Sequence, residues 1–235
     1  MGAGAVVSDP DRLMVYETDA LGRFFQLPLA VVLPSTTEEA AAVVRAVHGA
    51  GLPIVPRGAG TGLSGGAVAA PGSVMLGTAR MNRILTFDPT RRRARVQAGV
   101  LNAQLAALVR PHGLVYAPDP SSQAACTLGG NVAENSGGPH CLKYGVTRRY
   151  VQGLTLVDGD GAVVEIGGAS RARGSGLDLL GPVIGSEGCF GLVTEIELGL
   201  VPETEGVRTL LGLFESPADA GEAVTAIISD GLLPA

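Results

Sequence analysis

The chain has 235 residues, of which 46% are hydrophobic and 17% charged, so it can bury a core in one large domain or two smaller ones. Its formal net charge of −5 argues against a nucleic-acid partner, because proteins that bind a phosphate backbone usually carry a basic surface. No apolar run approaches the roughly 20 residues of a membrane helix, and residues 1–11 lack the pattern of a secretory signal.

The elements expected in the first half alternate between short apolar strands and two helices. Residues 35–39, Ser-Thr-Thr-Glu-Glu, offer two overlapping capping boxes in front of the first helix. A glycine-rich loop, "RGAGTGLSGG" at 57–66, follows the second strand directly. The pattern predicts strands at 29–33, 53–55, 73–78, 83–87 and 93–99, and helices at 40–50 and 101–110.

The second half contains a long segment without periodicity, residues 117–145, which is too long for an ordinary connection and is therefore expected to be functional. A hairpin with an Asp-Gly turn is predicted at 154–166. A further glycine cluster at 184–191 leads into an alternating strand at 192–198. A strand at 207–214 and an amphipathic helix at 217–230 end the chain.

The loop at 57–66 contains G-x-G-x-x-G, the dinucleotide fingerprint, at Gly60, Gly62 and Gly65. That fingerprint requires a helix directly after it, and Pro71 leaves no room for one, so an NAD-binding Rossmann site is the least favoured interpretation. A loop between two strands can still bind a diphosphate through a nest of backbone N–H groups, with Arg57 adding positive charge. A purely structural turn is the alternative, which three glycine clusters at strand ends make less attractive.

Three segments, "PRGAGTGLSGG", "TLGGNVAENSGGPHCLKYGVT" and "GSEGCFGLVTE", together resemble the flavin-linked enzymes of the vanillyl-alcohol oxidase and p-cresol methylhydroxylase superfamily. The branch with the strongest likeness comprises the FAD subunits of glycolate oxidase and D-lactate dehydrogenase. The resemblance implies an α+β, two-subdomain FAD-binding fold of the p-cresol methylhydroxylase type. It implies an FAD-binding domain over 1–205, with subdomains of about 1–99 and 100–205, and the incomplete beginning of a substrate (cap) domain over 206–235.

The same resemblance implies where FAD is held between the subdomains. Thr61 stands where relatives with covalently bound flavin carry the linking histidine, so non-covalent FAD is expected. No metal is expected in the site. The residues expected around the diphosphate are Arg57, Gly58, Ala59, Gly60, Thr61 and Gly62. Those expected to line the flavin and ribityl chain are Pro118, Thr127, Gly129, Gly130, Asn135, Ser136 and Gly137. Tyr144 and Gly145 are expected near the isoalloxazine, and Glu187, Gly188 and Val193 beside the adenosine end.

The implied function is the FAD-binding portion of a 2-hydroxy-acid dehydrogenase of the glycolate and D-lactate type, with hydride passing from substrate C2 to flavin N5. No catalytic residue is assigned, because the groups that grip the substrate are expected in a C-terminal cap that this chain lacks. A non-catalytic flavin-binding subunit of a larger oxidoreductase is the alternative. The expected partners are a small 2-hydroxy acid and an electron acceptor or partner subunits such as an iron–sulfur subunit. A second copy of the chain, paired through the open edge of the strand at 207–214, is a further expected partner.

Other candidate residues favour structural roles. Cys126, Cys141 and Cys189 are odd in number and lack C-x-x-C spacing, which suits reduced thiols in a cytoplasmic protein, with contact to the inner membrane face only through a partner. Adjacent residues in an extended segment point apart, so a catalytic pair of His140 and Cys141 is not favoured. The basic run "RRRAR" at 91–95 is expected to be a solvated turn that enters a strand.

Overall fold

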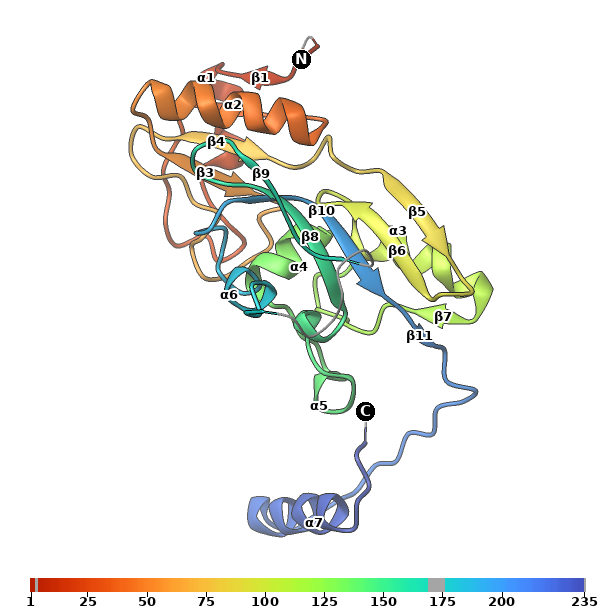
Figure 1. Ribbon diagram of the computed structural model, residues 1–235. Helices are drawn as coiled ribbons and strands as arrows, with labels where there is room; N and C mark the ends of the chain where they lie inside the picture. Colours follow the sequence, from red (N-terminus) through yellow and green to blue (C-terminus); the bar gives the residue numbers. More distant parts are fainter. Residues whose placement is uncertain (3, 169–175, 235) are drawn as a thin grey trace.

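The computed structural model describes residues 1–2, 4–168 and 176–234. Two larger sheets and a two-stranded one form the body, with helices packed on the larger two, and a C-terminal helix lies well away from them (Figure 1). Within the described residues no helix is both long enough and apolar enough to cross a bilayer. Helices and sheets are mixed without regular alternation, which confirms the α+β class.

The first sheet has the strand order β1-β2-β4-β3, with β2 and β3 both parallel to β4 and β1 antiparallel at the edge. Helix α2 begins where Thr36 caps it by accepting a hydrogen bond from the backbone N–H of Glu39, as the capping-box pattern predicts. Its apolar side packs on the sheet, with Val44 and Leu76 among the buried residues. The elements of this unit are β1 Val6–Val7, α1 Pro10–Leu13, η1 Met14–Tyr16, β2 Ala30–Val32, α2 Thr37–Gly49, β3 Ile54–Arg57 and β4 Val74–Gly77.

The second sheet is antiparallel, in the order β5-β6-β10-β8-β9. Burial alternates strictly along β10, so one face packs against α3 and α4, with Leu105 and Ile196 fully buried. The other face carries ion pairs such as Arg95 to Glu195 at 2.7 Å. The elements of this unit are β5 Ile84–Asp88, β6 Arg93–Gln97, α3 Asn102–Val109, η2 Arg110–His112, α4 Leu128–Glu134, α5 Cys141–Tyr144, η3 Thr147–Arg149, β8 Val151–Val157, β9 Val163–Gly167, α6 Leu180–Val183 and β10 Leu192–Gly199.

A chain of buried hydroxyl groups joins the two sheets. The Thr37 hydroxyl, at the start of α2, donates to Thr194 Oγ1 on β10 at 2.9 Å, and Thr194 donates in turn to the carbonyl of Thr155 on β8 at 3.2 Å. β5 and β6 belong to the second sheet, so the sheets divide the chain between Gly77 and Ile84, earlier than the expected subdomain boundary near residue 99.

The segment 117–145 is not an irregular loop throughout, because it contains α4 and α5. The sequence pattern did not predict α4, because its first turn contains Gly129 and Gly130 and glycine is unfavourable in a helix. A Cβ on Gly129 would lie 2.7 Å from Ala98 Cβ, so the helix can pack this closely on the end of β6 only with glycine at this position.

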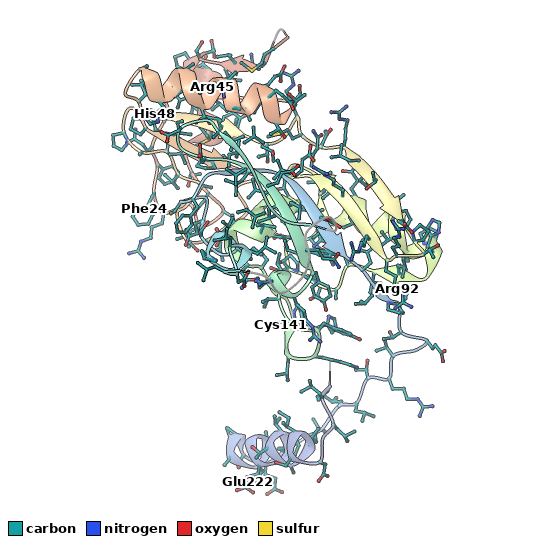
Figure 2. The ribbon with its side chains drawn as sticks, in the orientation of Figure 1. Phe24, Arg45, His48, Arg92, Cys141 and Glu222 are labelled. Atoms are coloured by element: carbon teal, nitrogen blue, oxygen red, sulfur yellow. The ribbon has the colours of Figure 1, made fainter. Side chains whose placement is uncertain are left out.

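The strand expected at 207–214 is not formed, whereas the helix after it is present as α7, Pro217–Ser229, with Ser216 as its N-cap. A strand needs a neighbour for its backbone hydrogen bonds, and within the described residues none pairs with this segment. Leu210 is 93% exposed, and Figure 2 shows the helix that carries Glu222 standing clear of the sheets. The basis for strand-edge dimerisation is therefore missing. The last strand of the body, β11 Val201–Pro202, pairs with β7 Leu114–Val115.

Candidate binding cleft

An open cleft lies where β3 and β4 end, and α4, α6 and the start of β10 form its other walls. Ligands of parallel sheets bind beyond the carboxyl ends of the strands, since the connecting loops there leave backbone groups free. The glycine-rich loop that follows β3 supplies one wall. Residues 63–72 after it form turns and no helix, as Pro71 predicts.

The glycines of the first loop are required by close packing. A Cβ on Gly58 would lie 2.5 Å from Thr127 Oγ1, at the start of α4. Gly60 has φ +73°, and a Cβ there would collide with the guanidinium of Arg57. The buried Arg57 side chain donates to the carbonyl of Ala67 at 2.8 Å and lies over the ring of Tyr16, 5.8 Å from its centroid. Arg57 thus braces the loop from within and also lines the cleft.

The opposite wall is α4. Thr127 caps it by accepting from the N–H of Gly130 at 3.1 Å, and the helix ends at Asn135, which has φ +49°. The side chain of Asn135 accepts from the backbone N–H of Arg148 at 2.9 Å, so it holds the next segment in place. α4 is therefore fixed at both ends.

Two carboxylates, those of Glu134 and Glu187, line the cleft beside the glycine-rich loop. A Cβ on Gly66 would lie 2.6 Å from Glu187 Oε2, so the carboxylate of Glu187 lies directly over this loop. Partial burial, together with the charge of Glu187, raises the pKa of Glu134, and a hydrogen bond from Ser64 opposes the shift. Carboxylates repel phosphate and accept hydrogen bonds from hydroxyl groups. These carboxylates therefore suit the hydroxyls of a sugar, whereas Arg57 and the glycine N–H groups suit a diphosphate.

Two buried polar groups in the cleft have no hydrogen-bond partner. They are the hydroxyl of Thr78, directly after β4, and the side-chain nitrogen of Asn131, on α4. Unpaired buried groups are uncommon and suggest that a ligand supplies the partner. The sequence gives no signal for Thr78, because it lies in no motif. Asn131 lies inside the second glycine motif, but nothing local distinguishes it from the other residues there.

Most of the residues that the resemblance implied line this one cleft. The cleft also contains residues that were not expected, among them Ser122, Cys126 and Ser186. The expected residues found in its walls are Arg57, Gly58, Ala59, Gly60, Thr61, Gly62, Thr127, Gly129, Gly130, Ser136, Glu187, Gly188 and Val193. The expected residues that lie outside its walls are Pro118, Asn135, Gly137, Tyr144 and Gly145.

The segment around α5 projects away from the sheets, and Cys141 is exposed on it (Figure 2). His140 pairs through Nδ1 with the carboxylate of Asp119, which the sequence alone did not suggest. No pair of His140 with Cys141 is seen in the described part of the chain. Cys126 is buried, as expected of a small thiol, and burial raises its pKa. Among the described residues no three His, Cys, Asp or Glu side chains are grouped so as to hold a metal ion.

The donor set fits FAD. The cleft is lined by glycine backbone and by Arg57, and by two carboxylates that can accept hydrogen bonds from hydroxyl groups. It is also lined by two buried polar groups that can form hydrogen bonds with a ligand. FAD offers a diphosphate, sugar and ribityl hydroxyls, and a ring system rich in acceptors, so every feature of the cleft has a counterpart in this cofactor.

Comparisons with known proteins agree with this chemistry. Residues 28–167 match the model of a family described as "FAD binding domain". The chain is 44% identical over 229 residues to glycolate oxidase subunit GlcD of Escherichia coli K12, covering 97% of this chain and 46% of that protein. It is 40% identical over 207 residues to D-lactate dehydrogenase of Anaerostipes hadrus, covering 88% of this chain and 43% of that one.

Among solved structures, alkyldihydroxyacetonephosphate synthase superposes with a TM-score of 0.86 at 24% identity, covering 98% of this chain and 44% of that one. That likeness shows a common fold. The chain spans less than half the length of each of these three proteins. The family match extends over more than half of the chain and includes the cleft-lining residues from Arg57 to Ser136. The chain therefore belongs to the FAD binding domain family.

Proposed function

We propose that this chain is the FAD-binding portion of a 2-hydroxy-acid dehydrogenase of the glycolate and D-lactate type. The observation that carries the proposal is the cleft between β3, β4 and α4, whose glycine backbone, guanidinium and unpaired polar groups match FAD. The names of two relatives, a glycolate oxidase subunit and a D-lactate dehydrogenase, support the substrate class. Bound FAD supplies the hydride acceptor, and the protein binds and orients it.

Within the cleft, the backbone from Gly58 to Gly62 would hold the diphosphate, with Arg57 contributing positive charge. Glu187 would accept hydrogen bonds from hydroxyl groups at the adenosine end. Thr61 lines the cleft and has no side-chain atom that forms a flavin bond of the histidyl type, which supports non-covalent FAD. The expected residues outside the walls, among them Tyr144 and Gly145, would meet the flavin where it extends from the cleft toward the α5 segment.

We further propose that residues 1–205 form the FAD-binding domain and that 206–235 begin a substrate domain. The separation of α7 from the sheets supports this division (Figure 1). Its exposed apolar residues, including Leu211 and Ile227, require a partner surface. The electron acceptor would be a partner subunit, which agrees with the description of one relative as a subunit.

The test begins with the absorption spectrum of the purified chain after titration with FAD. We expect a protein-bound flavin spectrum, no binding of NAD, and release of all flavin to the supernatant on acid precipitation. Flavin that remains in the precipitate would contradict non-covalent binding. Anaerobic addition of glycolate or D-lactate to the whole enzyme, which includes the substrate domain proposed to begin at residue 206, then tests the substrate class, with L-lactate as the control. Bleaching by the first two supports the dehydrogenase, and an unchanged spectrum with all three would leave a flavin-binding subunit as the function.

A further inference from the structure

Two side chains from different walls of the cleft are buried without an oxygen or nitrogen hydrogen-bond partner. Thr78 is 4% exposed and Asn131 is 1% exposed, and the unpaired atoms are Thr78 Oγ1 and Asn131 Nδ2. The described residues include other buried unpaired atoms, on Ser73, Tyr116 and Gln152, but none of those residues lines the cleft. The two unpaired groups in the cleft therefore coincide with the place where a ligand is expected.

The Thr78 hydroxyl is held in place by its backbone. Its N–H donates to the carbonyl of Arg57 at 2.9 Å, and its carbonyl accepts from the N–H of Met81 at 2.8 Å. The missing side chain of Gly99 allows this carbonyl to pack directly against the chain there. The backbone of Thr78 cannot shift to find its hydroxyl another partner, so only rotation about χ1 remains.

The Asn131 amide is held equally firmly on α4. Its backbone N–H donates to the carbonyl of Thr127 at 2.9 Å, and its carbonyl accepts from the N–H of Ser136 at 2.9 Å. The buried thiol of Cys126 makes a side-chain hydrogen bond with Asn131, but sulfur is only a weak acceptor. The amide nitrogen thus retains its capacity to donate to a stronger acceptor in the cleft.

We propose that Thr78 and Asn131 are cofactor-positioning residues that bind FAD from the two walls. Asn131 Nδ2 donates to an oxygen or ring-nitrogen acceptor of FAD, and the Thr78 hydroxyl bonds to a second polar atom of the cofactor. Since Thr78 follows β4 of the first sheet and Asn131 lies on the helix packed on the second, one FAD molecule connects the two sheet units. This inference rests on the proposed binding of FAD and is independent of which 2-hydroxy acid is oxidised.

A positioning role and a structural role predict opposite effects on the protein without FAD. An unpaired buried hydroxyl destabilises the cofactor-free protein, so replacing it with an apolar group of the same shape is neutral or stabilising. The same replacement removes a bond to FAD. Thr78→Val should therefore leave the melting temperature of the cofactor-free protein unchanged or higher while weakening FAD binding about 5- to 30-fold. Asn131→Leu should behave in the same way.

The chain offers matched controls. Ser73 is 0% exposed and its hydroxyl is also unpaired, but it lies outside the cleft. Ser73→Ala should not alter FAD affinity. Thr78→Ser keeps the hydroxyl and should bind FAD within about twofold of the wild type, which separates loss of the hydrogen bond from a change of shape.

The experiment measures FAD dissociation constants by flavin fluorescence titration, and melting temperatures without FAD by circular dichroism. Weaker FAD binding by Thr78→Val and Asn131→Leu at undiminished apo stability supports the inference. Wild-type affinity in both variants overturns it, and so does a loss of affinity matched by a similar loss of apo stability. A wild-type chain that does not bind FAD at all would overturn the proposed function together with this inference, so the wild-type titration tells the two failures apart.

Discussion

Gly129→Ala provides a direct test of how α4 is positioned. In an ordinary helix this substitution stabilises a protein by about 0.4–1 kcal/mol, because alanine has less freedom in the unfolded chain. At Gly129 the new Cβ would lie 2.7 Å from Ala98 Cβ and 2.9 Å from the Ala98 carbonyl oxygen. Both distances are well below ordinary contact, and the backbone N–H of Gly129 already donates to that carbonyl at 2.7 Å. The helix must therefore move away from β6.

Overpacking of this kind costs about 1–3 kcal/mol, which exceeds the gain in helix propensity. We expect a net loss of about 1–2 kcal/mol, or about 2–8 °C in melting temperature for a domain of this size. FAD affinity should fall as well, because Thr127 and Gly130 lie in the cleft wall that moves.

Gly49→Ala is the matched control. Gly49 ends α2, and a Cβ there would meet no atom within 4 Å. This variant should melt slightly above the wild type, with unchanged FAD affinity. Thermal unfolding followed by circular dichroism distinguishes the two. A Gly129→Ala protein as stable as Gly49→Ala would refute the argument that close packing on Ala98 requires glycine.

The other predictions concern a carboxylate, a buried hydroxyl and the C-terminal segment. The raised pKa of Glu134 means that the folded protein retains this proton to higher pH than the unfolded chain, so its contribution to stability falls as pH rises above the ordinary 4.5. Glu134→Gln should therefore be more stable than wild type at about pH 7, by under about 1 kcal/mol because the group is partly exposed. Urea unfolding measures this difference in stability. A difference that does not grow between about pH 4 and pH 7 would contradict the prediction. Thr194→Val leaves the buried Thr37 hydroxyl without its acceptor and should lower the free energy of unfolding by about 1–3 kcal/mol in the same assay. An unchanged urea midpoint would show that these hydroxyl groups do not stabilise the contact between the sheets. Limited trypsin digestion should cut after the exposed Arg208 well before the sites after Arg93 and Arg95 within β6, and resistance at Arg208 would indicate that 207–214 is covered.

Elements with a local signal were predictable from the sequence. Helix α2 was predicted from Thr36 and Glu39, which form its cap in the structure. Strand β10 was predicted from alternating apolar and polar residues, and its burial alternates in the same way. The basic run forms a turn at Arg92, with φ +54°, before β6 begins, as expected. In each case a short window of sequence contains the signal, either a cap, an alternation of apolar and polar residues, or a turn.

Many residues in the walls of the cleft were expected from the family resemblance, and the glycine motifs by themselves predicted a loop that could bind a diphosphate. Gly58 and Gly60 illustrate the physical reason: a Cβ on Gly58 would lie 2.5 Å from Thr127 Oγ1, and Gly60 has a φ of +73°, which disfavours any side chain. The positions of Tyr144 and Gly145 beside a flavin are still predictions.

Tertiary contacts decided the rest. Position 129 on α4 requires glycine because its packing on Ala98 leaves no room for a side chain, and this contact joins residues far apart in sequence. Residues 207–214 have strong apolar character but no strand to pair with among the described residues, so the same sequence pattern yields no strand. Thr78 and Asn131 matter because their polar atoms are buried and unpaired, and neither property is local: each depends on what the folded chain places around the side chain and on what it leaves open.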